Sequence, residues 1–168
     1  MTTDLLPGRL LRVEVVAVTH PGQRRSENQD QFLVANLDAR DPDEPLLHGG
    51  DDRPGLHGPT LFEVGPLGGL LLVADGMGGA AGGATASGMA VRVIHGMMST
   101  QWSEERRRVP VTFARHLAGA LEQANTLIHD RSRREADLSG MGTTATAVGV
   151  LDSHLILGQV GDSRAYLV

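Results

Sequence analysis

The sequence predicts an α+β domain in which an antiparallel sheet and a set of helices are segregated along the chain. Strand-like segments come first, two helical patterns follow, and further strands joined by hairpin-length links close the order. Alternating βαβ units would instead space strands and helices evenly. A length of 168 residues suits one domain with one core, and no internal repeat divides it.

The composition limits the classes of partner. Apolar residues make up 40% of the chain but aromatic residues only 3%, so the core must consist mainly of Val, Leu, Ile, Ala and Met. The formal net charge is −5, and no basic stretch is longer than Arg106–Arg108. This balance argues against a nucleic acid or an anionic membrane held by bulk electrostatics.

Two residue types are absent, and their absence excludes several chemistries. The chain has no Cys, which excludes disulfides, thiolate nucleophiles and cysteine-ligated metal sites. All 15 basic residues are Arg, which excludes Schiff-base catalysis and the phosphate-binding lysine of a P-loop. The sequence shows no secretory signal and no apolar run long enough to span a membrane, so we expect a cytoplasmic protein.

The N-terminal part predicts two strands followed by a long polar segment. The first strand covers Leu10–Val18, where small apolar residues alternate with Arg, Glu and Val, and the second covers Gln31–Leu37. Between Asp38 and Pro66 the composition changes to Asp, Pro, Gly and His. We expect an exposed insertion over residues 38–66 that adds little to the core.

A buried strand and two amphipathic helices form the predicted centre. The strand is the apolar run Gly69–Ala74. Apolar residues then recur at three- and four-residue steps on two helical stripes, the second of which begins after Pro110. The first stripe comprises Ala86, Met89, Ala90, Val93, Ile94 and Met97, and the second Phe113, Leu117, Leu121, Ala124 and Ile128.

Three further strands are predicted after the helices. They cover Thr143–Leu151, Leu155–Val160 and Ala165–Val168, and Asp152 and Ser153 turn the first into the second. The domain is therefore expected to extend from residue 10 to residue 168.

The end of the central strand is the most informative local feature. The apolar run stops at Asp75, and a glycine-rich turn follows at once. Residues 76–81 also satisfy the dinucleotide fingerprint G-x-G-x-x-A. However, Asp75 would place a negative charge beside the pyrophosphate, and no acidic residue lies about 20 positions further on to hold a ribose. A plain strand-to-helix turn is the other simple interpretation.

Three more blocks accompany this turn, and together they carry a resemblance. They are Arg25–Asp30 before the second strand, Gly140–Thr144 before the strand after the helices, and Gly161–Tyr166 between two apolar runs. With Asp75–Gly79, these blocks resemble the protein phosphatase 2C-type (PPM) family of metal-dependent Ser/Thr phosphatases in its bacterial form. The resemblance covers nearly all of the chain from about Val13 onward.

The resemblance implies a four-layer α/β/β/α sandwich with a two-metal centre between two antiparallel sheets. It places Asp75 as the carboxylate that bridges two ions, with the Gly76 carbonyl as a further ligand. Asp30 would hydrogen-bond water bound to the metal, and Asp162 would contact an additional, weaker ion. Arg25 would bind the substrate phosphate through its guanidinium fork.

The chemistry that the family implies agrees with these residue types. Oxygen ligands suit Mn²⁺ or Mg²⁺, and two such ions neutralise a phosphate monoester and activate a water for in-line attack. We therefore expect hydrolysis of phosphoserine and phosphothreonine in proteins, with targets of bacterial Ser/Thr kinases as partners. No role for nucleic acid or membrane is expected.

The chain departs from the family pattern in two ways. Gln29 stands where many members have Glu, and its amide can still orient water. The family also continues beyond Gly161–Arg164 into strands and helices with an Asp-Gly and an Asp-Asn block, which these 168 residues do not contain. Asp30, Asp75 and Asp162 supply at most three negative charges against the four positive charges of two ions, so weak binding is expected.

From this we expect an N-terminal fragment with little activity alone, in which uncovered sheet edges and apolar faces favour aggregation. The alternatives are a non-catalytic remnant that binds a phosphoprotein or another partner, and a nucleotide-binding domain. No catalytic role is assigned to any of the seven His residues, which are scattered without metal-ligand spacing.

Overall fold

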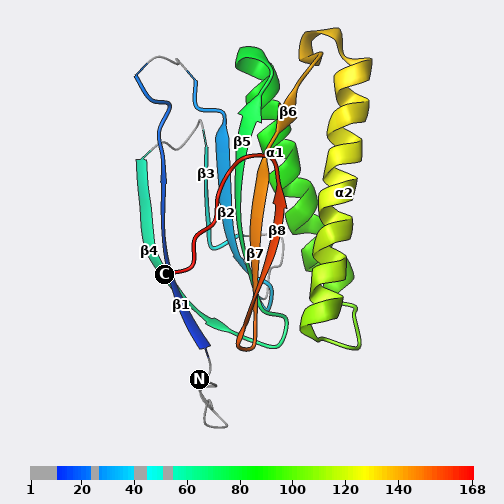
Figure 1. The fold of residues 1–168 in the computed structure, drawn as a ribbon. Helices are drawn as coiled ribbons and strands as arrows, with labels where there is room; N and C mark the ends of the chain where they lie inside the picture. Colours follow the sequence, from blue (N-terminus) through cyan, green and yellow to red (C-terminus); the bar gives the residue numbers. More distant parts are fainter. Residues whose placement is uncertain (1–10, 24–26, 40–44, 51–54) are drawn as a thin grey trace.

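The computed structural model describes residues 11–23, 27–39, 45–50 and 55–168, which form layers of helices and sheets (Figure 1). The helices cover one face of a six-stranded sheet, and a two-stranded sheet lies on its other side. The α+β class with two antiparallel sheets flanked by helices is therefore confirmed. The described residues supply both sheets and one helical layer of the expected sandwich.

The elements follow the predicted order. The strands are β1 (Leu11–Thr19), β2 (Asp30–Asn36), β3 (Leu47–Gly49), β4 (Gly55–Val64), β5 (Gly69–Met77), β6 (Gly142–Thr143), β7 (Ala145–Leu151) and β8 (His154–Val160). The helices are α1 (Gly79–Met97), the π-helical turn η1 (Met98–Trp102), α2 (Pro110–Arg134) and the 3₁₀ turn η2 (Ala136–Leu138).

β5 is the central strand of the large sheet. The strand order is β3-β2-β5-β7-β8, every pair is antiparallel, and β6 extends the ladder along the end of β5. Leu70, Leu72 and Ala74 are at most 2% exposed and face the helices. The predicted strand Gly69–Ala74 is confirmed. β5 extends beyond Asp75 to Met77, because Gly76 and Met77 pair with β6.

Both predicted helical stripes face the core. Ala86, Ala90 and Ile94 of α1 are buried against the sheet, and the small residues allow close packing. Phe113 of α2 fills the space above Gly149, where a Cβ would lie 2.1 Å from the Phe113 ring. The periodicity of the sequence was therefore a sound guide to which faces are buried.

A π-helical turn between the helices places the single tryptophan in the core. Trp102 is fully buried, and its indole Nε1–H donates a hydrogen bond to the Leu67 carbonyl at 2.7 Å. Its ring meets that of Phe113 edge to face, with centroids 5.0 Å apart. Trp102 thus joins the helical layer to the turn before β5.

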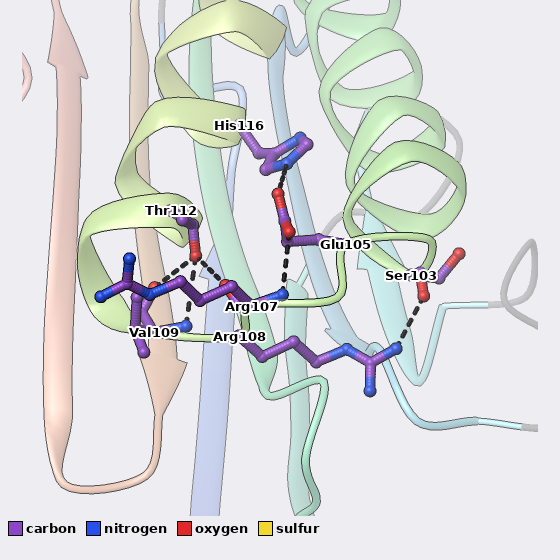
Figure 2. Close-up of polar contacts among 7 residues, drawn as sticks. All are labelled: Ser103, Glu105, Arg107, Arg108, Val109, Thr112 and His116. Carbon is purple, nitrogen blue, oxygen red and sulfur yellow. Dashed lines mark hydrogen bonds and ion pairs between the residues drawn. The ribbon is translucent and has the colours of Figure 1, made fainter.

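The loop before α2 is held by polar contacts that include a histidine (Figure 2). The Thr112 hydroxyl donates to the Arg107 carbonyl at 2.5 Å and accepts from the Val109 N–H at 3.2 Å. Glu105 accepts from the Arg107 N–H at 2.9 Å and lies 3.3 Å from the His116 ring. The Arg107 N–H and then the His116 ring hold the pKa of Glu105 below its usual value. His116 therefore has a structural partner.

Two expectations need correction. The described residues between 38 and 66 contribute to the core instead of forming an exposed insertion: they contain β3 and β4, and Phe62 and Val64 are buried in a cluster between the two sheets. The partner of β4 is the distant strand β1, and this long-range pairing hid the strand in the sequence. Residues 165–168 form no strand and are exposed, and they pair with no strand among the described residues. The domain boundary at residue 10 stays a prediction.

Candidate metal centre

Asp30 and Asp75 face each other at the same edge of the large sheet. Asp30 begins β2, and the antiparallel register of β2 and β5 places it directly opposite Asp75. Residues that are directly opposite in such a pair project on the same face of the sheet. Asp30 is half-buried and Asp75 is exposed, so both carboxylates lie near the solvent boundary.

The backbone hydrogen bonds of Asp75 determine how close the two residues come. The Asp75 N–H donates to the Thr144 hydroxyl at 3.0 Å, and its carbonyl accepts from the Thr144 N–H at 2.9 Å. The Thr143 hydroxyl donates to the same carbonyl at 3.0 Å. Because these bonds point away from β2, Asp30 and Asp75 form a non-hydrogen-bonded pair, the type in which Cα atoms lie about 4.5 Å apart.

Asn28 fixes the backbone of Asp30 through a side-chain hydrogen bond. Its side chain is 2% exposed, its amide donates to the Thr19 hydroxyl at 2.6 Å, and its side-chain oxygen accepts from the Asp30 N–H at 3.2 Å. The start of β2 is thus tied to the end of β1. Two rigid strands, rather than a loop, present the carboxylates.

Gly76 is required by the approach of α1. A Cβ on Gly76 would lie 2.1 Å from the Gly83 carbonyl oxygen and 2.9 Å from that of Gln29. The Gly76 N–H donates to the Gln29 carbonyl at 3.1 Å. Glycine is therefore needed because the helix packs directly against the strand, and the proposed ligand role of its carbonyl stays a prediction.

The turn that holds Asp162 is tethered to the same strand end. The Ser163 hydroxyl lies 2.8 Å from the Thr144 hydroxyl, which in turn accepts from the Asp75 N–H. Asp162 itself is exposed and lies at the rim of an open groove of about 720 Å³ between the helices and the ends of β6 and β8. The Gly161–Arg164 and Asp75–Gly79 blocks are thus brought together.

The donor set suits a hard divalent cation, although it is small. Asp30 and Asp75 offer carboxylate oxygens at facing positions, where two like charges are unfavourable until a cation lies between them. Across the described ranges, no group of three or more His, Asp or Glu side chains is close enough to hold an ion. Arg25 lies outside the described residues, so its predicted contact with phosphate stays a prediction.

Three residues hold the site together through contacts that sequence reasoning did not predict. They are Thr144, Ser87 and Gln29. Thr144 was visible only as part of a motif block. Ser87 is fully buried in a stretch rich in Ala and Gly, and a hydroxyl on the apolar face of the predicted helix, next to Ala86, was the available signal. The Gln29 amide donates to the Gly79 carbonyl at 2.6 Å, and the expected orientation of water by Gln29 stays a prediction.

The dinucleotide interpretation of residues 76–81 does not suit this sheet. That fingerprint belongs to a parallel βαβ unit, whereas β5 is antiparallel to every strand that it pairs with among the described residues. The glycines serve the turn itself, since Gly78 and Gly79 have φ angles of 116° and 76°.

Within the described residues, no helix is both long and apolar enough to cross a membrane.

Comparison with known proteins points to one family. The family described as Protein phosphatase 2C matches residues 60–168. The serine/threonine phosphatase stp of Listeria monocytogenes is 38% identical over 100 residues, which are 59% of this chain and 38% of that protein. The chain thus matches well under half the length of this relative.

Two solved structures share the fold. The serine/threonine phosphatase of S. agalactiae superposes with a TM-score of 0.61 at 26% identity, covering 93% of this chain and 50% of that one. The catalytic domain of the phosphatase PstP in complex with two manganese ions gives a TM-score of 0.59 at 25% identity, with the same coverage of 93% and 50%.

Proposed function

The chain belongs to the protein phosphatase 2C family, and from that membership we propose that it supplies part of a Mn²⁺- or Mg²⁺-dependent centre for hydrolysing phosphoserine and phosphothreonine in proteins. The observation that carries the proposal is the facing pair of Asp30 and Asp75 beside the Gly76 turn. The manganese-bound relative supports the choice of metal. Phosphoproteins made by bacterial Ser/Thr kinases are the proposed substrates, and the cytoplasm is the proposed location.

Each site residue has a proposed task. Asp75 and Asp30 hold the cation pair from the sheet edge, with Asp30 acting partly through bound water, and the Gly76 carbonyl adds a neutral oxygen. Asp162 contacts a third, weaker ion. Arg25 orients the phosphate by a two-point contact. When bound, the ions would neutralise the phosphate and lower the pKa of a water molecule.

We further propose that the 168 residues bind these ions weakly and act slowly by themselves. Asp30, Asp75 and Asp162 carry at most three negative charges, while two divalent ions carry four positive ones. The deficit raises the cost of holding both ions together. Activity of this chain should therefore rise with Mn²⁺ concentration without saturating at micromolar levels.

Calorimetric titration with Mn²⁺ tests the proposal. We expect the chain to bind Mn²⁺ with a Kd that rises at least about tenfold in Asp75→Asn, because one carboxylate is lost while the side-chain shape is kept. Asp152→Asn is the matched control, since this aspartate lies in the exposed turn between β7 and β8. Its affinity should equal that of the wild type.

Hydrolysis of a phosphothreonine peptide at millimolar Mn²⁺ gives the second measurement. The proposed function predicts slow release of phosphate that Asp75→Asn abolishes. Peptide binding that neither Mn²⁺ nor Asp75→Asn affects would contradict it, and would favour a non-catalytic binding module.

A further inference from the structure

We propose that Ser87 of α1 is a positioning residue for the carboxylate pair, acting through a three-residue brace formed with Gln29 and Gly76. This inference rests on the proposed metal-binding function. The Ser87 hydroxyl has no contact with either carboxylate in the described structure, but it holds the backbone that sets their spacing.

The brace is built around one carbonyl oxygen. The Gln29 carbonyl accepts from the Gly76 N–H at 3.1 Å and from the Ser87 hydroxyl at 2.7 Å. Gln29 directly precedes Asp30, and Gly76 directly follows Asp75. A single oxygen therefore links the residues next to both carboxylates, and the helix donates the second hydrogen bond.

Close packing makes this arrangement rigid. Ser87 is 0% exposed, and its hydroxyl also lies 3.1 Å from the Gly83 carbonyl one turn earlier. A Cβ on Gly83 would lie 2.5 Å from the Gln29 side-chain oxygen, so the glycine leaves room for the amide in this position. The Gln29 amide then reaches the Gly79 carbonyl at 2.6 Å. Helix, turn and β2 thus meet without spare space.

Removal of the Ser87 hydroxyl would weaken the brace without opening a large cavity. In Ser87→Ala the Gln29 carbonyl loses its hydroxyl donor and keeps its bond from the Gly76 N–H, which lies one position beyond the last paired residues of β2 and β5. Without the second donor this bond opens more often, and each opening lets Asp30 move relative to Asp75. Groups that hydrogen-bond the ligating side chains directly typically change metal affinity by about 10- to 100-fold, and Ser87, which acts through the backbone beside the ligands, is expected at the lower end of that range.

Two measurements on the full 168-residue chain test the proposal, and one needs no metal. Hydrogen exchange of the Gly76 amide in metal-free protein should be about tenfold faster in Ser87→Ala than in wild type. The Kd for Mn²⁺ should rise about tenfold in the same variant.

Ser99→Ala is the matched control. Ser99 lies 12 residues further along the same helical segment and is 4% exposed, so the same hydroxyl is removed from a similarly buried position. At about 1.5 Å per residue, that position is about 18 Å from Ser87. The control should change neither Gly76 exchange nor Mn²⁺ affinity, whatever it does to stability.

Failure of the brace, of the positioning role and of metal binding would each give a different result. Unchanged Gly76 exchange in Ser87→Ala would show that there is no brace. Faster exchange with an unchanged Kd, or an equal loss of affinity in Ser99→Ala, would reduce Ser87 to a structural residue and overturn the positioning role. If the wild type binds no Mn²⁺, the proposed function fails and takes the positioning role with it, while the exchange data still show whether the brace exists.

Discussion

Gly76 is the residue at which the backbones of β5 and α1 meet most directly. Its missing Cβ would overlap the Gly83 carbonyl, which is backbone and therefore has little freedom to move away. A methyl group there must separate α1 from β5 or distort the turn. Gly76 directly follows Asp75 and belongs to the brace, so any distortion there reaches the carboxylate pair.

We therefore predict that Gly76→Ala lowers the free energy of unfolding by at least about 2 kcal/mol, the usual cost of overpacking. Urea unfolding followed by Trp102 fluorescence measures it. Gly119→Ala is the control, because a Cβ on Gly119 meets no atom within 4 Å and should raise stability by up to about 1 kcal/mol. A Gly76→Ala variant as stable as the wild type would contradict the overlap.

At this scale, the sequence identified the residues but not their contacts. Asp75 and Gly76 were recognisable from the apolar run that ends before them. The direction of the Gln29 amide was not, because its acceptor is a backbone carbonyl, and no side-chain pattern marks the place of a carbonyl.

The helices are the elements whose sequence pattern was easiest to interpret. Each presents a stripe at three- and four-residue steps, and each stripe is buried as expected, from Ala86 to Ile94 in α1 and from Phe113 to Ile128 in α2. Local periodicity suffices for such a prediction. The π-helical turn that follows α1 was not predicted, because it involves a hydrogen bond from Trp102 to the Leu67 carbonyl, 35 residues earlier, which local periodicity does not encode.

The N-terminus of α2 depends on Thr112. Its hydroxyl donates to the Arg107 carbonyl and accepts from the Val109 N–H, so one side chain ties the backbone before the helix to its first turn (Figure 2). We predict that Thr112→Val, which keeps the shape and removes the hydroxyl, lowers the free energy of unfolding by about 1 kcal/mol. Thr126→Val in the middle of α2 is the control, since its exposed hydroxyl bonds only the carbonyl four residues earlier. Equal losses in the two variants, measured by urea unfolding, would argue against a cap.

Across the whole molecule, one face of the large sheet is only partly covered. Ile156 and Gly158 of β8 pack toward the helices, so Leu155 and Leu157 point to the opposite side, where they are 60% and 54% exposed. Val73 of β5 is also half exposed. β8 is an edge strand, and it carries neither proline nor a charged Asp, Glu, Lys or Arg. These are the features that favour association through strand edges.

We predict that Leu157→Lys reduces self-association, because a charge on this edge disfavours the addition of another strand. Light scattering during storage at increasing protein concentration measures the effect. Leu127→Lys, on an exposed position of α2, is the control for added charge alone and should change scattering less. Equal reductions in the two variants would show that net charge, not the edge, governs association.

The layer order was predictable from the sequence, but the long-range pairing was not. Strand and helix patterns, read in order, were enough for the α+β class. The pairing of β1 with β4 was hidden because turn-forming residues dominate the segment around β4. The register that sets Asp30 opposite Asp75 depends in the same way on contacts between distant segments, which no local pattern encodes.

The hydrogen bond between Asp75 and Thr144 spans 69 residues of sequence. Contacts that close such long segments form late when a chain folds, because the entropy of the intervening segment must be lost first. During synthesis, the Asp75 backbone cannot be fixed until Thr144 has left the ribosome. Capacity to hold a cation should accordingly arise abruptly near the end of folding, after the helices have already formed.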